Sequence, residues 1–310
     1  MALPTLILAT RRSALAIQQS NGVKSELERK IPGARIELLT MGTTGDRLRE
    51  RPLPQIGGKG LFTMELEEAL LDGRAHFAVH SLKDLPTELG AGLTLAAIPP
   101  REDSRDALVS RTGKPFAELP SGARIGTSSV RRAAQLRRLR PDTRIEPLRG
   151  NLDTRLRKLR EGSLDAIVLA AAGLHRMGWQ EQITEYFPVQ VLYPAVGQGA
   201  LGIEARAADH STLETLSVLE DPWSRICITA ERSLLRHLGG GCQIPIAAHT
   251  QREMNGVSLD AIVIRTDGTE IIQANDSCPE ASVGTAEALG KNVAENLLRQ
   301  GARRILESTP

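Results

Sequence analysis

The feature that most constrains the fold is an alternation of short apolar segments with helical segments. In the first stretch of the chain, strands are predicted at residues 6–9, 35–41, 75–80 and 94–98. Helices are predicted from Ser13, a candidate N-cap, to about Lys30 and again over residues 61–71. A second stretch repeats this order, with strands at residues 107–110, 124–126, 144–147 and 165–170. Because strands that alternate with helices are typical of α/β domains, two α/β lobes are expected.

Two short segments connect these stretches. Residues 99–103 are polar and stiff and indicate a linker, and residues 194–199 indicate a second crossing. The apolar residues 200–203 are then expected to return to the first sheet. Two similar lobes joined by two crossings resemble a periplasmic-binding-protein-like clamshell, which holds its ligand in a cleft at strand ends.

From about Leu219 the pattern changes to a helix followed by hairpins. The helix is predicted at residues 225–238, and three strands are predicted at residues 246–251, 257–264 and 270–274. Asn255-Gly256 and Asp267-Gly268 between these strands are strong hairpin signals. A last helix is expected to begin near Pro279 and to end before Gly301. This part is predicted to be a small α+β domain.

A length of 310 residues also favours two or three domains over one. The predicted fold is therefore α/β, with two periplasmic-binding-protein-like lobes around a cleft plus a small α+β third domain. The predicted domains are residues 1–99 with 200–218, residues 100–199, and residues 219–310.

Charge, cysteines and hydropathy narrow the functional classes. The formal net charge is only +2, which favours neither nucleic acid nor a membrane as a partner. No apolar run is long enough to suggest a membrane span, and the N-terminus is interpreted as a strand, not a signal peptide. Three widely spaced cysteines without a C-x-x-C pair fit a reducing cytoplasm. The histidines are scattered, so no metal site is expected.

The densest chemical signal is arginine. Residues 131–160 contain ten Arg and one Lys against three acidic residues, a local charge of +8. A solvated helix surface is the interpretation for Arg137, Arg138, Arg140, Arg157 and Arg160. A nucleic-acid patch is weakened by the absence of aromatic residues for base stacking. A pocket for several carboxylates is favoured for Arg131, Arg132, Arg149 and Arg155, because Arg binds carboxylates bidentately and each lies near a loop-to-helix junction.

Two polar turns strengthen the hypothesis of an anion pocket. Thr127-Ser128-Ser129 connects a strand to a helix, so hydroxyls and free backbone N–H groups could face a ligand together. The alternative is an ordinary Ser N-cap, for which one hydroxyl suffices. Arg11-Arg12-Ser13 repeats the arrangement in the first lobe.

A cation and a carboxylate lie side by side at the end of another predicted strand. Taken alone, Lys83 and Asp84 are most simply a surface ion pair in a turn. In a functional role, Asp84 would hold or transfer a proton on a cationic intermediate, and Lys83 would bind an anionic group. Residues 57–60 lack the flanking pattern of a Walker A loop, so a nucleotide is not expected.

A thiol is placed on a glycine-rich loop. Cys242 follows three glycines, residues 239–241, and precedes Pro245. Glycines expose the thiol, although a tight turn with an incidental cysteine is the simpler interpretation of this stretch alone.

These motifs together resemble the porphobilinogen deaminase (hydroxymethylbilane synthase) family in their order and spacing. The matching segments are residues 57–62, 79–84, 126–132, 148–151, 194–199 and 231–247. The resemblance implies a transferase of tetrapyrrole (heme) biosynthesis that links four porphobilinogen molecules head to tail into hydroxymethylbilane. Ammonia is released at each step. It also implies a dipyrromethane cofactor, held by a thioether to Cys242.

The resemblance further implies individual roles. Asp84 matches the catalytic aspartate, which would stabilise positive pyrrole and azafulvene intermediates and assist proton movement. Cofactor contacts are implied for Ser81, Lys83, Asp84, Thr127, Ser128, Ser129, Arg131, Arg132 and Asn151. Contacts with the acetate and propionate groups of the substrate are implied for Arg11, Ser13, Arg149, Arg155, Arg176 and Gln198. Each pyrrole unit carries two carboxylates, which an arginine-lined cleft would balance.

The resemblance also implies a monomer and, at residues 42–60, a mobile loop that covers the site. The main alternative is a non-catalytic clamshell binding protein for a small polycarboxylate. That alternative accounts for the two lobes and the arginines, but not for the third domain, Cys242 or Asp84. A nucleic-acid binder is a more distant alternative.

Overall fold

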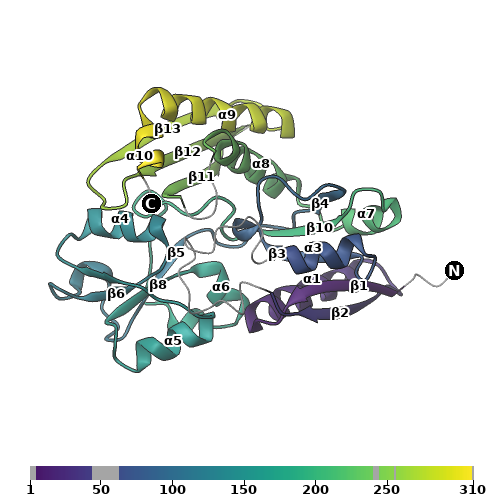
Figure 1. Ribbon diagram of the computed structural model, residues 1–310, viewed down its shortest axis with the longest axis horizontal. Helices are drawn as coiled ribbons and strands as arrows, with labels where there is room; N and C mark the ends of the chain where they lie inside the picture. The colour runs from purple at the N-terminus through teal and green to yellow at the C-terminus, as the bar shows by residue number, and fades with distance from the viewer. Residues whose placement is uncertain (1–4, 44–62, 240–243, 255, 309–310) are drawn as a thin grey trace. The chain divides into compact units, whose positions relative to one another are not determined.

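The computed structural model describes residues 5–43, 63–239, 244–254 and 256–308. Cys242, Asn255 and most of the predicted loop at residues 42–60 lie outside the described residues. The chain groups into two compact units, residues 1–101 with 200–225 and residues 102–199 with 226–310. Each unit carries a five-stranded sheet flanked by helices, which confirms the α/β class (Figure 1).

The sheet of the first unit has the order β2-β1-β3-β10-β4. Its strands are β1 (Thr5–Arg11), β2 (Arg35–Met41), β3 (Phe77–Ser81), β4 (Leu93–Ala97) and β10 (Leu201–Arg206). β1 runs parallel to β2 and β3, whereas β10 is antiparallel to β3 and β4. The predicted return of residues 200–203 to the first sheet is therefore confirmed.

Helices cover both faces of this sheet. They are α1 (Ala14–Lys30), α3 (Met64–Leu71) and α7 (His210–Ser217), and the 3-10 turn η2 (Leu82–Asp84) follows β3. Phe77 of β3 is buried in a cluster with Leu27 of α1, and its neighbour Ala78 is buried in a second cluster with Leu66 of α3. Because successive side chains of a strand point to opposite faces, β3 is held from both sides. This packing fixes the end of β3, where Ser81 and the turn begin.

The second unit contains a sheet of order β7-β6-β8-β5-β9. Its strands are β5 (Asp106–Ser110), β6 (Arg124–Gly126), β7 (Arg144–Glu146), β8 (Ala166–Ala170) and β9 (Glu185–Tyr186). The helices beside it are α4 (Val130–Leu139), α5 (Leu152–Arg160) and α6 (Ala171–Arg176), with 3-10 turns η3 (Phe116–Glu118) and η4 (Gln180–Gln182). β6 is parallel to β7 and β8, and β5 is antiparallel to β8.

The same unit contains the predicted hairpins. β11 (Ile246–Arg252), β12 (Val257–Ile264) and β13 (Ile271–Cys278) form an antiparallel sheet, accompanied by α8 (Pro222–His237), α9 (Val283–Arg299) and α10 (Ala302–Glu307). β13 is longer than the strand predicted at residues 270–274, because its polar residues still pair with β12 up to Cys278. The predicted boundaries of three domains stay a prediction, since both sheets of the second unit belong to one compact group.

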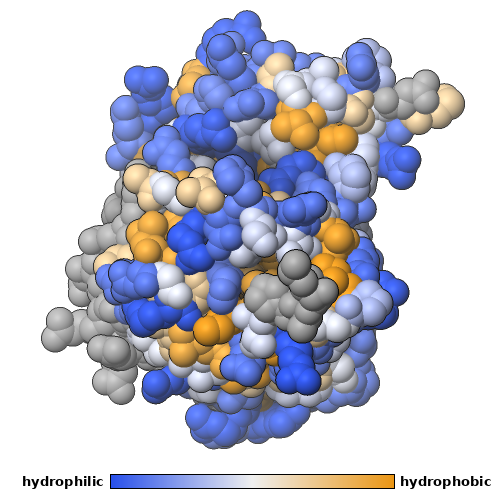
Figure 2. All heavy atoms as spheres, turned by 90° about the vertical axis from the view of Figure 1, so that its right-hand side faces the viewer, coloured by the Kyte–Doolittle hydropathy of each residue, from blue (hydrophilic) through white to orange (hydrophobic). Residues whose placement is uncertain are grey.

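The surface carries scattered apolar side chains. Figure 2 shows separate groups of hydrophobic atoms among mostly hydrophilic ones. Large exposed apolar residues of the described chain include Met64, Leu71 and Val218. Single exposed apolar side chains of this kind are normal for folded proteins.

Gly290 of α9 lies so close to α8 that it has no room for a side chain. A Cβ atom there would lie 2.2 Å from the carbonyl oxygen of Ala230 and 2.7 Å from Cβ of Ser233. We expect Gly290→Ala to lower the free energy of unfolding by about 2 kcal/mol or more, because overpacking displaces the helices. Gly284→Ala on the same helix meets nothing within 4 Å and is expected to raise it by up to about 0.5 kcal/mol. Chemical denaturation measures both, and equal effects would contradict the close packing.

Candidate active site

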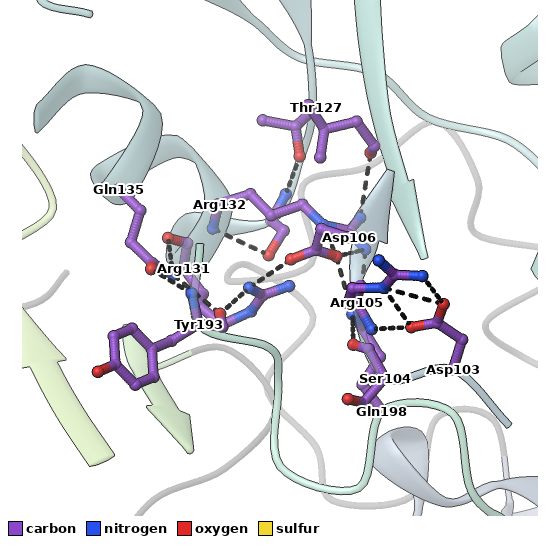
Figure 3. Close-up of polar contacts among 12 residues, drawn as sticks. Asp103, Ser104, Arg105, Asp106, Thr127, Arg131, Arg132, Gln135, Tyr193 and Gln198 are labelled. Carbon is purple, nitrogen blue, oxygen red and sulfur yellow. Dashed lines mark hydrogen bonds and ion pairs between the residues drawn. The ribbon is translucent and has the colours of Figure 1, made fainter. Parts of the chain in front are cut away.

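A buried carboxylate, Asp106, organises the polar centre of the second unit (Figure 3). Arg131 donates from Nη1 to Oδ2 of Asp106 at 2.7 Å, and Arg132 donates from Nη2 and Nε to Oδ1 at 2.6 and 2.9 Å. Gln198 donates from Nε2 to Oδ1 at 2.8 Å and to the Ser104 carbonyl oxygen. The sequence placed Arg131, Arg132 and Gln198 in the site, and the structure brings them together around a residue that the sequence did not single out.

Local structure explains why these arginines point inward. Ser129 caps the N-terminus of α4 and accepts from the backbone N–H of Arg132, so both arginines lie in the first turn of the helix. Arg131 also donates to the carbonyl oxygen of Tyr193. The amide of Gln135 binds both backbone groups of Tyr193: it donates to the carbonyl oxygen and accepts from the N–H. These hydrogen bonds hold Tyr193, the residue just before residues 194–199, against α4.

The cluster of Asp106, Arg131 and Arg132 carries one positive charge in excess. The two arginines are only 4% and 5% exposed, and Asp106 is fully buried. Burial alone would raise the pKa of Asp106, but the two guanidinium groups hold that pKa well below its ordinary value. The cluster therefore consists of two cations and one carboxylate. The partial positive charge at the N-terminus of α4 increases the positive potential of the cluster further.

Nε of Arg131 is buried and has no hydrogen-bond partner within the described part of the chain. Buried donors of native proteins are nearly always paired, so an unpaired one calls for an explanation. An anionic oxygen beside this group would satisfy the donor and balance the excess charge. A carboxylate-bearing ligand thus fits the chemistry of the cluster.

Some hydroxyl groups of the turn Thr127-Ser128-Ser129 already form hydrogen bonds within the protein. The Ser129 hydroxyl acts as the N-cap, as the alternative interpretation expected, and Ser128 donates from its hydroxyl to the Leu148 carbonyl oxygen at 2.9 Å. Thr127 is buried, and its hydroxyl accepts from the Ser129 N–H at 3.2 Å. Ser128 is exposed and its hydroxyl oxygen can still accept a further hydrogen bond.

The other predicted residues of the second unit lie around the start of α5, except Arg176, which is the last residue of α6. Asn151 is the N-cap residue of α5 without a side-chain capping bond, and Arg155 donates from Nε to the Gly150 carbonyl oxygen at 2.8 Å. Arg149 is half-buried just before them. Arg176 donates to the Gly199 carbonyl oxygen at 2.7 Å, and burial lowers its pKa from the ordinary value, although Glu102 opposes this.

Four of the five arginines interpreted as helix surface are exposed, namely Arg137, Arg138, Arg157 and Arg160. For Arg140 the interpretation is wrong: it is half-buried, because it pairs with Asp142 and also donates to the carbonyl oxygens of Phe116 and Leu119. The charge of +8 over residues 131–160 therefore divides into an outer solvated part and an inner part. Only the inner part, around Asp106, is buried.

In the first unit, Asp84 lies on a turn that is held in place by buried leucines. Leu82 and Leu85 on either side are 1% and 3% exposed, and the Leu82 N–H donates to the Ala200 carbonyl oxygen at 3.0 Å. Asp84 itself is exposed, and Lys83 is half-buried. The buried leucines thus hold a turn whose carboxylate faces solvent.

The remaining predicted residues of this unit lie near helix α1. Ser81 exchanges hydrogen bonds with the amide of Gln19 at 3.1 and 3.3 Å, and Ser13 caps α1 by accepting from the Ala16 N–H. Arg11 is the last residue of β1 and is half-buried. The cysteine of the glycine-rich loop, Cys242, lies outside the described residues.

The sequence did not reveal three buried carboxylates. Besides Asp106, Glu231 of α8 is fully buried and accepts from the Gly197 N–H at 2.8 Å and from the Thr250 hydroxyl at 2.9 Å. Glu204 of β10 is fully buried beside His80. An acidic residue within or at the edge of an apolar strand, as in Asp106-Ala107-Leu108-Val109, is the signal that marks such positions.

Across the described ranges, no three or more His, Cys, Asp or Glu side chains are grouped so as to hold a metal ion. Within the same ranges, no helix combines the length and the hydropathy that a membrane span requires.

The α/β fold and the buried, net-positive arginine cluster fit the class of proteins that bind small anionic molecules. Comparison with known proteins defines the family. Residues 6–214 match the family described as "Porphobilinogen deaminase, dipyromethane cofactor binding domain". Residues 225–299 match "Porphobilinogen deaminase, C-terminal domain".

Similar curated proteins agree with these matches. The porphobilinogen deaminase of Syntrophobacter fumaroxidans is 51% identical over 97% of this chain and 96% of its own length. That of Geobacter metallireducens is 49% identical over 99% of this chain and 95% of its own. The chain belongs to the porphobilinogen deaminase family.

Solved structures with a similar course of the chain include a lipoprotein from Bacillus subtilis. It shares 11% identity with a TM-score of 0.42, covering 71% of this chain and 92% of its own. An arginine-specific periplasmic binding protein from Salmonella typhimurium shares 15% identity with a TM-score of 0.37, covering 70% and 92%. The family assignment does not depend on them.

The function predicted from the motifs is thereby confirmed. The protein is a transferase that condenses four porphobilinogen molecules into hydroxymethylbilane with release of ammonia, and it uses a dipyrromethane cofactor. The alternative, a non-catalytic polycarboxylate-binding protein, is not supported.

Proposed function

We propose that the buried arginine cluster binds carboxylates of the dipyrromethane and that Asp84 serves the reacting centre. The observation that carries the first part is the excess positive charge around Asp106, together with the buried Nε of Arg131, which has no hydrogen-bond partner among the described residues. A group with several carboxylates fits such a site, because charge-assisted hydrogen bonds satisfy both the donor and the charge. When bound, the dipyrromethane supplies the primer on which the pyrrole chain grows.

Further residues are proposed to contact the cofactor or the substrate. Ser81, Lys83, Thr127, Ser128 and Asn151 supply hydroxyl, ammonium and amide groups at strand ends and helix starts for the cofactor. Arg11, Ser13, Arg149, Arg155 and Arg176 supply donors for the acetate and propionate groups of porphobilinogen. Gln198 is fully buried against Asp106, so we propose that it supports Arg132 from within rather than binding the substrate.

Asp84 is proposed to act on the positive charge that forms when ammonia leaves porphobilinogen. Its carboxylate is exposed at the turn, so it can approach a bound molecule without a change in the core. A carboxylate beside a developing cation lowers the energy of that cation, and it can also hold the proton that moves in the step.

Cys242 is proposed as the covalent attachment point, by a thioether. We expect the intact mass of the purified protein to exceed the mass of its sequence by one dipyrromethane, and Cys242→Ser to lack this addition. Cys278→Ser is the matched control, because Cys278 is a half-buried free cysteine on β13, and its variant should keep the added mass. A fully active wild-type protein without added mass would disprove covalent attachment.

We also propose that the enzyme is a cytoplasmic monomer. The cysteines support a reducing compartment, because the three are widely spaced along the chain and form no C-x-x-C pair. Size-exclusion chromatography with light scattering tests the oligomeric state, and a dimer mass would contradict it.

A further inference from the structure

A buried imidazole–carboxylate pair lies directly behind the turn that carries Asp84. Nε2 of His80 is 2.9 Å from Oε2 of Glu204, and their side chains are 4% and 0% exposed. Neither oxygen of Glu204 nor Nε2 of His80 has a partner with hydrogen-bond geometry among the described residues. Their close approach to each other is thus the only compensation described for the burial of these atoms.

The register of the sheet explains how the two side chains meet. His80 faces Gly202, and Ala78 faces Glu204, across the antiparallel pair β3 and β10. Residues directly opposite share a face of the sheet, so His80 and Glu204 are diagonal neighbours on one face. Because Gly202 has no side chain, the space opposite His80 is open, and the Glu204 side chain extends through it to His80.

The turn packs over the same place. A Cβ atom on Gly202 would lie 3.1 Å from Cδ1 of Leu82 and 3.4 Å from Cδ2 of Leu85. These are the two buried leucines that seat the turn around Asp84. The two leucines therefore pack over Gly202, the residue opposite His80, on the same face of the sheet as the pair. Because packed interiors leave little room for displacement, a shift of β10 at this point would displace the turn as well.

Stability alone does not account for this pair. Burial removes both groups from water, and their attraction repays that cost only with good geometry and further hydrogen bonds. Apolar residues of similar volume often stabilise a protein as well as a buried ion pair does. In some proteins a buried polar pair serves instead to fix how two elements are aligned.

We propose that His80 and Glu204 form a positioning pair for the known reaction: they hold the end of β3 against β10 and so fix the direction in which the turn presents Asp84. The proposal rests on the catalytic role of Asp84 proposed above. Neither residue touches the substrate in this role. Both act through the turn of Ser81 to Asp84.

The test replaces the pair by apolar residues of similar size, His80→Leu with Glu204→Leu. We expect the melting temperature and the covalently added mass to stay near wild type, since the apolar pair packs in the same space. We expect kcat to fall roughly tenfold or more with KM changed less than about twofold, because small misplacement of a reacting group costs rate. Unchanged kcat in the folded variant overturns the proposal.

A double-mutant cycle with Asp84→Ala separates this role from a general effect. If the pair acts through Asp84, replacing the pair in the Asp84→Ala background causes little further loss of kcat. If the two effects are independent, the two losses of kcat multiply. Multiplying losses overturn the proposal. If Asp84→Ala itself retains near-normal turnover, the proposed role of Asp84 is wrong, and that result is separate from the cycle.

Two further variants complete the design. Glu204→Gln keeps the shape of the side chain and is used if the double leucine variant does not fold. The same fall in kcat is expected, and unchanged kcat overturns the proposal. Asp209→Asn is the control, because it weakens the ion pair of Arg206 and Asp209, 2.6 Å apart, beyond the far end of β10. It should leave kcat unchanged, and a fall equal to that of Glu204→Gln would show that any charge near β10 matters.

Discussion

Asp84→Ala is expected to keep the fold and to lose nearly all turnover. The side chain is exposed, and Leu82 and Leu85 seat the turn without it, so the melting temperature should stay close to that of the wild type. The loss in kcat is expected to be roughly 10²- to 10⁴-fold, the usual contribution of a positioned acid or base. Steady-state assays of porphobilinogen consumption measure it, together with thermal denaturation.

The matched control for this variant is Glu88→Ala. Glu88 is another exposed carboxylate, four residues further along the chain. Its removal changes the local charge by the same amount but should leave kcat unchanged. Near-normal turnover in Asp84→Ala, or equal losses in the two variants, would remove Asp84 from the catalytic role.

Asp106→Asn is expected to have the largest effect on stability. The variant keeps the shape of the side chain but leaves Arg131 and Arg132 buried without a counter-charge. Breaking a buried ion pair by removing one partner costs about 3 to 5 kcal/mol of unfolding free energy. We expect a loss of about 3 kcal/mol by chemical denaturation, and a smaller fraction of molecules with the added cofactor mass.

The surface pair of Arg140 and Asp142 supplies the comparison. These side chains are also joined, at 2.7 Å, but they are 21% and 37% exposed. Asp142→Asn is therefore expected to change the unfolding free energy little, because water screens the pair. Similar losses for Asp106→Asn and Asp142→Asn would contradict the importance of burial.

The pH dependence of the Asp106 variant follows from the direction of the pKa shift. The pKa of Asp106 in the folded protein is held below its ordinary value. Its contribution is thus complete above the pKa of an unfolded aspartate, about 3.9, and is lost as the pH falls toward the folded pKa. The difference in unfolding free energy between wild type and Asp106→Asn should shrink below about pH 4. A constant difference would contradict the assignment.

Much of the local structure could be predicted because it depends on neighbours in the sequence. The strand at residues 35–41 follows from its Ile and Leu residues, and the Ser13 cap follows from the capping preference of serine. The place of Arg131 and Arg132 in the first turn of a helix could be predicted because they follow a polar turn. The exposed place of Asp84 was likewise indicated by its turn at the end of a strand.

The sequence by itself determined the family and most of the strands and helices of the sheets, and it predicted which residues bind an anion. Only the tertiary structure decided which carboxylate each cation faces, since Asp106 lies 25 residues from Arg131 and 92 from Gln198 along the chain. It also paired His80 with Glu204 through the register of β3 and β10. The physical reason is that Coulombic attraction and burial depend on distance in space. That distance is set by strand order and register, which no local pattern of residues encodes.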